Sequence, residues 1–154
     1  MNLLQAIIHY ICRNYPYPDE LSKARLTKMV YLADWKAAQQ SGTQITDIDW
    51  VFNHYGPYVE DVVEAATGTP GLEVVHSTNV YGSPKVLVRA VDDIRFTILP
   101  SEVAEILDEV IEDTSPLSFN AFIKHVYDTF PIRTADRYAT LNLAYLASQE
   151  QSKR

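Results

Sequence analysis

The chain has 154 residues, of which 47% are hydrophobic and 21% are charged, and its net charge at pH 7 is −7. This length fits one domain with one core, here residues 1–154, and the composition excludes a disordered chain and a membrane protein. Because no apolar run approaches the roughly 20 residues that span a bilayer and no secretory signal is visible, the sequence predicts a cytoplasmic protein without a membrane partner.

Two helices are expected in the first part of the chain. Apolar residues on one face indicate a helix from about residue 2 to residue 14, which Pro16 and Pro18 end. A second helix begins near residues 19–22 and ends at Gly42, which is expected to be a left-handed C-cap. The buried stripe of this second helix is expected to contain Leu26, Met29, Val30, Ala33 and Ala37.

A strand and a third helix are expected next. Apolar and polar residues alternate from Gln44 to Asn53, which is typical of a strand. The sequence His54-Tyr55-Gly56-Pro57 then predicts a turn, with Pro57 at the first helical position, where its missing N–H costs nothing. The third helix is expected to end at Gly68.

The remaining residues predict a hairpin and three more helices. The hairpin would pair Leu72–Val75 with Lys85–Ala90 around a long tip, and Arg95–Leu99 would add a further strand. The helices are expected at about Ser101–Ile111, Ser118–Phe130 and Thr134–Ser148. The fold class is therefore α+β and mainly helical, with about six helices, a small antiparallel sheet or hairpin, and a winged-helix-like order in the N-terminal half.

Negative charge is concentrated in two stretches of the chain. No Lys or Arg occurs between Lys36 and Lys85, and a second run, from Asp92 to Asp113, holds eight carboxylates against Arg95. The acidic residues of the first stretch are Asp47, Asp49, Glu60, Asp61, Glu64 and Glu73. Both stretches should repel phosphate and attract basic partners.

Neither a metal site nor a catalytic pattern is visible. The four histidines are far apart in sequence and lack the spacing of zinc ligands, and no nucleophile elbow or phosphate-binding loop is present. The single cysteine, Cys12, lies among apolar residues and is expected to be buried and unreactive. The sequence therefore predicts no enzyme activity, no metal and no cofactor, while an enzyme with converging titratable side chains stays open.

The segment His54-Tyr55-Gly56-Pro57-Tyr58 has two interpretations. It is either a packing turn with half-buried tyrosines, on which Tyr31 and Trp35 of the long helix should pack, or part of a contact surface, where tyrosine is enriched. The element order also resembles a winged helix, so a DNA-binding transcriptional regulator is the alternative function. Charge argues against it, because the helix in the recognition position, Tyr58–Ala66, offers three acids and no base.

The stretch from Leu26 to Ala66 resembles the Panacea domain, also called the SocA-like or GepA-type domain. Residues 26–33, LTKMVYLA, are similar to the family's L-x-K-L-x-Y-x-A helix, and Tyr55-Gly56-Pro57 is similar to its Y-G-P turn. Residues 99–111 and 117–131 run parallel to the family's acidic helix and the helix after it. Two departures occur, at Tyr58, where the family has a small aliphatic residue, and at residues 124–127, in its C-terminal motif.

This resemblance implies a non-enzymatic antitoxin of a bacterial or phage toxin–antitoxin pair. Such a protein neutralises its toxin by direct binding or acts as an adaptor that delivers the toxin to a protease. The implied partner is a cognate toxin, for which the charge pattern favours a basic surface, and no nucleic acid is expected. We expect the partner to contact Asp47, Asp49, Tyr55, Tyr58, Glu60, Asp61 and Glu64, with Tyr81 at the hairpin tip as a second contact.

Overall fold

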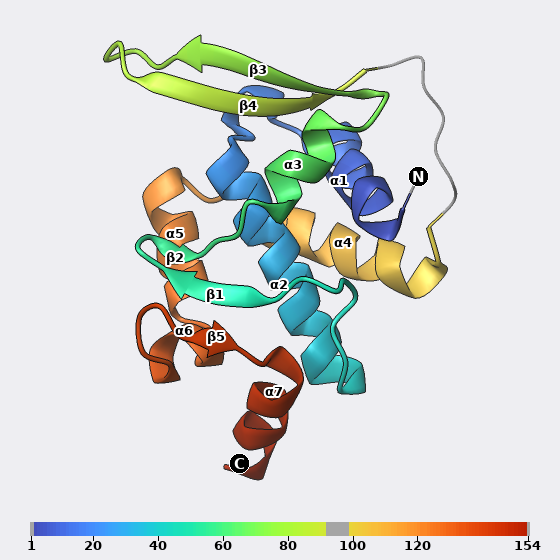
Figure 1. Cartoon of the computed structure of the whole chain (residues 1–154), viewed down its shortest axis with the longest axis vertical. Coiled ribbons are helices and arrows are strands. Elements are labelled where there is room, and N and C mark those ends of the chain that lie inside the picture. The colour runs from blue at the N-terminus through green and yellow to red at the C-terminus, as the bar shows by residue number, and fades with distance from the viewer. Residues whose placement is uncertain (1, 92–98, 154) are drawn as a thin grey trace.

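One long helix, α2 (Lys23–Ser41), runs through the centre of the molecule in the computed structural model (Figure 1). The Ser22 side chain caps its N-terminus by accepting a hydrogen bond from the Arg25 N–H. Its C-cap, Gly42, has a φ of 82°, which is the left-handed cap that the sequence predicts. Residues 25–35 are all buried, so other elements cover this helix on every side.

The structure describes residues 2–91 and 99–153, which form seven α-helices, one 3₁₀ helix and five strands. In chain order they are α1 (Leu3–Asn14), η1 (Pro18–Glu20), α2, β1 (Trp50–Asn53), β2 (Gly56–Pro57), α3 (Asp61–Thr67), β3 (Leu72–Thr78), β4 (Pro84–Ala90), α4 (Ser101–Thr114), α5 (Phe119–Tyr127), α6 (Phe130–Thr134), β5 (Thr140–Leu141) and α7 (Leu143–Ser152). The fold is α+β and mainly helical, as the sequence predicts. None of the helices in these residues is both long and apolar enough to cross a membrane.

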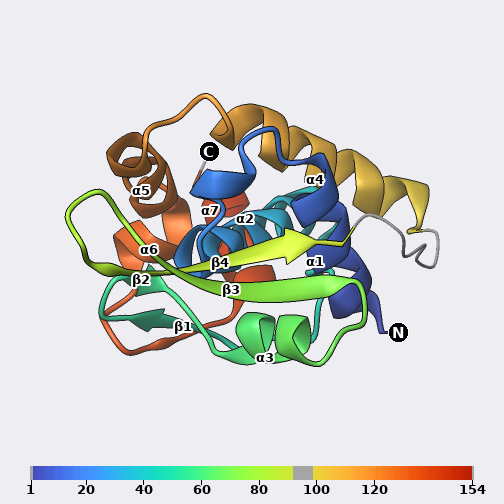
Figure 2. The same ribbon diagram turned by 90° about the horizontal axis from the view of Figure 1, so that it is seen from above.

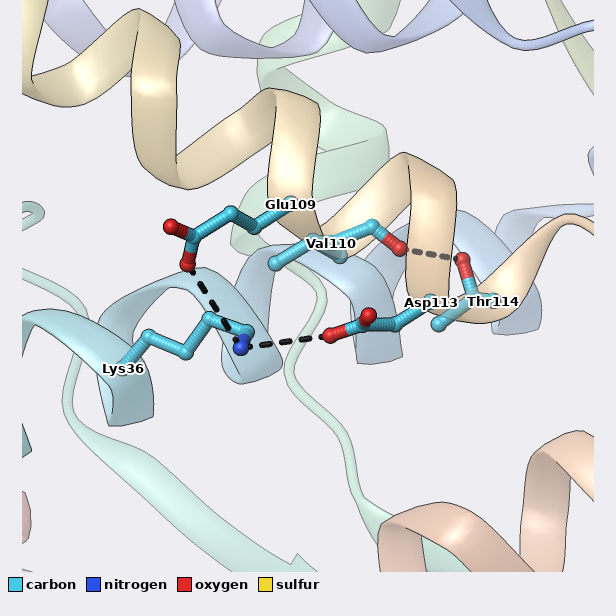
Figure 3. Close-up of polar contacts among 5 residues, drawn as sticks. All are labelled: Lys36, Glu109, Val110, Asp113 and Thr114. Carbon is cyan, nitrogen blue, oxygen red and sulfur yellow. Dashed lines mark hydrogen bonds and ion pairs between the residues drawn. The ribbon is translucent and has the colours of Figure 1, made fainter.

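The helices α1, α3, α4 and α7 all contact α2. Ion pairs also connect α4 to α2. Lys36 of α2 lies between Glu109 and Asp113 of α4, with its Nζ atom 3.7 and 3.2 Å from their carboxylate oxygens (Figure 3). On the same helix the Thr114 hydroxyl donates to the Val110 carbonyl. Both carboxylates are about half exposed, so these ion pairs orient the helices more than they stabilise them.

The strands form two separate antiparallel sheets. One has the order β2-β1-β5, and the other is the β3–β4 hairpin, which pairs from Leu72 and Ala90 out to Thr78 and Pro84. The winged-helix-like order of elements is present, but β1 pairs with β2 and β5 and not with this hairpin. Figures 1 and 2 show the β3–β4 tip, the β1–β2 turn and α5 on the same side of the molecule.

The base of the hairpin is attached to the segment that precedes α2. The Val88 N–H donates to the Leu21 carbonyl at 3.2 Å, and the Arg89 guanidinium lies 2.6 Å from the Asp19 carboxylate. Leu21 and Val88 are buried, so apolar packing supports this backbone contact. The hairpin is therefore held beside the N-terminus of α2.

The strand predicted from Gln44 to Asn53 is wrong over its first half, because β1 begins only at Trp50. The preceding loop instead wraps around the buried Asp34 carboxylate of α2. This carboxylate accepts hydrogen bonds from the Ile45 N–H at 2.9 Å, the Thr46 N–H at 3.0 Å, the Thr46 hydroxyl at 2.5 Å and the Trp50 indole N–H at 2.8 Å. A buried acid that binds these donors satisfies them without a strand ladder.

The position predicted for Pro57 is also wrong. Gly56 and Pro57 form β2, which pairs with Phe52 and Asn53, and α3 starts later, at Asp61. Gly56 has a φ of 100°, and this left-handed conformation turns the chain back along β1 before any helix begins. The segment is thus a tight hairpin turn followed by a short helix.

The C-terminal part differs from the prediction as well. The helix predicted from Ser118 to Phe130 ends at Tyr127, and the one predicted from Thr134 begins later, because Thr134 ends the separate short helix α6, which has Pro131 in its first turn. After Tyr138, whose φ is 71°, residues 140–141 pair with β1, and Asn142 caps α7. Of the strand predicted from Arg95 to Leu99, only Leu99 is among the described residues, and it is in no strand. The rest of this prediction lies outside the described residues.

Replacing Asp34 with asparagine should destabilise the fold. The amide keeps one acceptor oxygen but turns an NH₂ group toward the buried donors of Thr46 or Trp50, so at least one of them loses its partner. We expect a loss of about 2–4 kcal/mol in the free energy of unfolding, measured by urea denaturation.

The matched control for this substitution is Asp49→Asn, which changes an exposed carboxylate at the end of the same loop. Its free energy of unfolding should stay within about 0.5 kcal/mol of the wild-type value. Equal losses in both variants would show that the Asp34 hydrogen bonds do not organise the loop.

Candidate functional site

A pocket of about 420 Å³ lies between the first half of α2 and the β1–β2 turn. We call it the tyrosine-turn pocket. Its lining residues are Lys23, Ala24, Lys28, Asn53, His54, Tyr55, Tyr58 and Glu60. Helix α2 thus supplies a wall with two amines, and the turn supplies a wall with two tyrosines.

The close approach of the turn to α2 depends on Gly56. A Cβ atom at this position would lie 3.0 Å from a ring carbon of Tyr127 in α5 and 3.5 Å from Cε of Lys28. Tyr127 in turn packs edge-on against Phe52 of β1, with ring centroids 6.1 Å apart. The turn is therefore held between α2 and α5, which fixes one wall of the pocket.

Lys28 is the most unusual lining residue, because only 2% of its surface is exposed. Its Nζ atom lies 5.7 Å from the centroid of the Tyr58 ring. Within the described residues no hydrogen bond or ion pair to its ammonium group is found. Burial lowers the pKa of Lys28 to about 8, so the group still carries its charge at neutral pH at the expense of stability.

The neighbours of Lys28 on α2 show how unusual this is. Arg25, Lys28, Tyr31 and Asp34 follow one another at intervals of three residues, and all four are buried. Arg25 donates to two backbone carbonyls, at the end of α4 and just after it, Tyr31 shares a hydrogen bond with the Thr129 hydroxyl, and Asp34 holds the loop before β1. Three of these polar groups therefore hydrogen-bond to other elements of the fold, whereas the Lys28 ammonium faces the Tyr58 ring without a hydrogen bond among the described residues.

Tyr58 places a second polar group in the same pocket. Its hydroxyl is buried, and no described atom lies in hydrogen-bond geometry to it. Burial raises the pKa of Tyr58, and the nearby Glu60 carboxylate raises it further without meeting hydrogen-bond geometry. The ammonium of Lys28 and the hydroxyl of Tyr58 are thus two hydrogen-bond donors that line one pocket without acceptors.

The structure brings together three of the eight residues that the sequence predicts as contacts. Tyr55, Tyr58 and Glu60 all line the tyrosine-turn pocket. Tyr55 is 73% exposed, and its ring stands edge-on to His54 with centroids 4.5 Å apart. His54 lies 3.4 Å from the hydroxyl of the exposed Tyr138.

The other five predicted residues lie elsewhere. Asp47 and Asp61 line a groove with the first residues of α1, and Asp49 lines another hollow that Asp47 also borders. Glu64 is exposed on α3, and Tyr81 is 89% exposed at the tip of the β3–β4 hairpin. The predicted surface is therefore divided into separate patches.

Lys23 and Lys28 were missed by sequence reasoning as pocket residues. The charges along residues 37–84 indicate an acidic stretch. A count of charges does not reveal which helix packs against that stretch. The predicted apolar stripe of the long helix does not include either lysine, so periodicity gave no signal for them. In this pocket the acidic segment therefore faces amines from α2.

A second hollow continues from the tyrosine-turn pocket toward the hairpin. It shares Lys23 and Ala24 with that pocket and extends to Pro84 and Val86 of β4 and to Phe119 of α5, whose side chain is half exposed. The turn, the start of α2, the tip end of the hairpin and α5 thus border two adjoining hollows that share Lys23 and Ala24.

Catalysis commonly uses metal sites and nucleophiles. The described residues contain no group of three or more His, Cys, Asp or Glu side chains that could hold a metal ion. Cys12 is buried, as predicted, and burial raises the pKa of its thiol to about 12, so it is a poor nucleophile.

The side chains of Tyr31 and Trp35 are also buried. The Tyr31 ring packs edge-on against Trp50 of β1, and the Tyr31 hydroxyl shares a hydrogen bond with the Thr129 hydroxyl.

The chain matches a known protein family. The family model described as "Antitoxin SocA-like, Panacea domain" matches residues 26–131, which is more than half of the chain. This range contains Lys28, the β1–β2 turn and the β3–β4 hairpin. Neither the curated proteins nor the solved structures contain a significant match to the chain.

Replacing Lys28 with methionine should stabilise the protein at pH 7 and change how stability depends on pH. The folded-state pKa of about 8 lies below the ordinary value of 10.5, so between these pH values the unfolded state binds more protons. The wild-type free energy of unfolding should therefore gain up to about 3 kcal/mol from Lys28 as pH rises through this window. A methionine side chain at this position does not titrate, and this gain should vanish.

Chemical denaturation at pH 7, 8, 9 and 10 measures this effect. Lys36→Met is the matched control, because Lys36 lies on the same helix but pairs with two exposed carboxylates. Its pH dependence should follow the wild type. If Lys28→Met and the wild type show the same slope, the ammonium is not desolvated in the folded protein.

Proposed function

The chain belongs to the family of SocA-like antitoxins with a Panacea domain, and we propose that it neutralises a protein toxin by binding it directly. The match over residues 26–131 carries this conclusion, and it supports an antitoxin role in general. The toxin would be the cognate partner in a bacterial or phage toxin–antitoxin pair. In this proposal the chain acts by contact and not by catalysis.

Exposed aromatic side chains support a protein partner. Tyr55 is 73% exposed on the β1–β2 turn, and Val80 and Tyr81 are 92% and 89% exposed at the tip of the hairpin. Figure 2 shows the turn and the tip on the same side of the molecule, so one partner can contact both. Tyrosine is enriched among the residues that contribute most to binding at protein interfaces.

Charge supports a partner with a basic surface. Glu60 is exposed on the rim of the tyrosine-turn pocket, Asp61 and Glu64 are exposed on α3, which follows it in the chain, and the whole chain has a net charge of −7. Helix α3, in the position of a recognition helix, has seven residues without a base and buries Val62 and Ala66. We therefore propose a protein and not a nucleic acid as the partner.

Charge reversal at Glu60, Asp61 and Glu64, each to lysine, should slow association with the toxin. Rim charges steer the encounter, so we expect an association rate about tenfold lower and a weaker dependence on salt. Stopped-flow measurements with the toxin encoded beside this chain's gene give both quantities, and co-expression scores the rescue of growth.

The control for charge reversal is the triple variant Glu102→Lys, Glu105→Lys and Glu112→Lys. It makes the same change in net charge on exposed positions of α4. Its association rate should fall much less. If both triple variants lose association equally, net charge and not the proposed surface steers the toxin.

Replacing Tyr55 or Tyr81 with alanine should speed dissociation and leave association almost unchanged. Both side chains are exposed, so their loss should not disturb the fold. For an anchoring tyrosine we expect a cost of about 2 kcal/mol, or a dissociation rate roughly 30-fold higher. Tyr145→Ala on α7 is the matched control, because Tyr145 is also exposed but lies on a different element.

The same co-expression also distinguishes two modes of neutralisation. In direct neutralisation the toxin level stays constant and a stable complex is recovered. In delivery to a protease the toxin level falls when the antitoxin is present and recovers in a protease-deficient host. Full rescue by a folded variant that lacks both tyrosines and carries all three charge reversals would contradict this placement of the interface.

A further inference from the structure

We propose that the tyrosine-turn pocket binds one carboxylate, supplied by an Asp or Glu side chain of the partner protein. The identity of that partner as a toxin rests on the proposed function. The preference for a carboxylate rests on the pocket's own residues. Lys28 would be its central contact, and Tyr58 would supply a second hydrogen bond.

Two donors that lack acceptors carry this inference. The Tyr58 hydroxyl is buried without a hydrogen-bond partner among the described residues, and the Lys28 ammonium, with three N–H donors, lines the pocket with the Tyr58 ring 5.7 Å away and no hydrogen bond or ion pair within the described part of the chain. A lysine with only 2% of its surface exposed and no ion pair is costly, whereas a methionine of similar length would fill the same space without that cost. A carboxylate has two oxygens that can accept from both donors, and such charge-assisted hydrogen bonds are strong.

The charge balance of the pocket favours a singly charged anion. Lys23 and Lys28 bring two amines, and Glu60 brings one carboxylate, so the lining leaves one positive charge to be neutralised. A phosphate group carries nearly two negative charges at neutral pH and would also face Glu60. One carboxylate completes the balance and leaves no net charge behind.

Glu60 also indicates what should surround that carboxylate. It is exposed on the rim of the pocket and lies near Tyr58, so it can meet a basic residue next to the bound acid. The partner would therefore present an acidic side chain flanked by bases. Opposite charges at the centre and at the rim fix the register of two surfaces, and a uniformly basic partner would leave Lys28 unpaired.

The test uses two capped tripeptides, acetyl-Arg-Glu-Arg-amide and acetyl-Arg-Gln-Arg-amide, and inorganic phosphate. Each is titrated into the full chain while the backbone amide signals of Gly56 and Tyr58 are followed by ¹H–¹⁵N NMR. The glutamate peptide should give a saturable shift at both amides with millimolar affinity. The glutamine peptide should bind about tenfold more weakly, because it lacks the charge.

Two variants and one control locate the binding. Lys28→Met should weaken the glutamate peptide about tenfold, and Tyr58→Phe, which keeps the ring, should weaken it about threefold. Lys36→Met, on the same helix but outside the pocket, should bind like the wild type. The Tyr58→Phe variant keeps the test valid if Lys28→Met alters the fold.

Three results would overturn the inference: no saturable shift, equal shifts with the glutamine peptide, or tighter binding of phosphate than of the glutamate peptide. Failure of the proposed function looks different. If the neighbouring toxin is not neutralised but the glutamate peptide binds through Lys28, the pocket stands and the antitoxin assignment falls. If the toxin is neutralised equally well by Lys28→Met and the peptide does not bind, the antitoxin role stands and the pocket falls.

Discussion

The position of the β1–β2 turn depends on one buried carboxylate. Asp34 accepts hydrogen bonds from the loop that follows α2, and this contact decides that β1 begins at Trp50. Trp50 then packs its ring on Tyr31 of α2, with centroids 5.6 Å apart. Because β1 is fixed at this register, its partner β2 and the turn between them are fixed over the first half of α2. The pocket exists where these two elements meet.

Helix α2 therefore both holds neighbouring elements in place and lines the pocket. Buried polar residues three positions apart along the helix perform these two roles. Arg25, Tyr31 and Asp34 each contact a different part of the fold, and together they hold α4, the junction between α5 and α6, and the loop before β1 in place. A polar group in a core is tolerated when it is hydrogen-bonded, and each of these three side chains makes at least one such bond, although the Arg25 Nε has no partner among the described residues. Lys28 lies between them on the same spacing and faces the pocket. The rigidity that its neighbours supply lets it stay desolvated and oriented before any partner arrives.

The sequence allowed good prediction wherever the signal was local. Periodicity located the first two helices, Gly42 marked the end of α2, and β-branched residues indicated the β3–β4 hairpin. Residues 44–49 alternate between apolar and polar as in a strand. Alternation does not reveal that Asp34, which lies 11 and 12 residues before Ile45 and Thr46, accepts hydrogen bonds from their N–H groups. The short β5 was invisible too, because two residues carry no periodicity and their pairing with β1 spans most of the chain.

The same distinction explains the candidate site. Tyr55, Tyr58 and Glu60 are close in sequence, so their proximity in space could be expected. Lys28 is not on the predicted buried stripe, and neither its burial nor its lack of a hydrogen-bond partner could be predicted, because both depend on what α5 and the turn bring to its end. Asp47 and Asp49 were grouped with the turn by sequence distance, and the loop around Asp34 carries them to other hollows.

The pairing of β5 with β1 bears on how such antitoxins can be recombined. The family match ends at residue 131, yet Thr140 and Leu141 lie beside Val51 and Trp50, directly behind the turn. The Phe52 N–H also donates to the Ala139 carbonyl. A chimaera joined at residue 131 would exchange the pocket without the strand that supports it from behind. The unit that evolution or an engineer can transplant between toxins therefore extends past the boundary that sequence similarity marks, and substitutions in β5 can alter the position of a turn through the strand that lies between them.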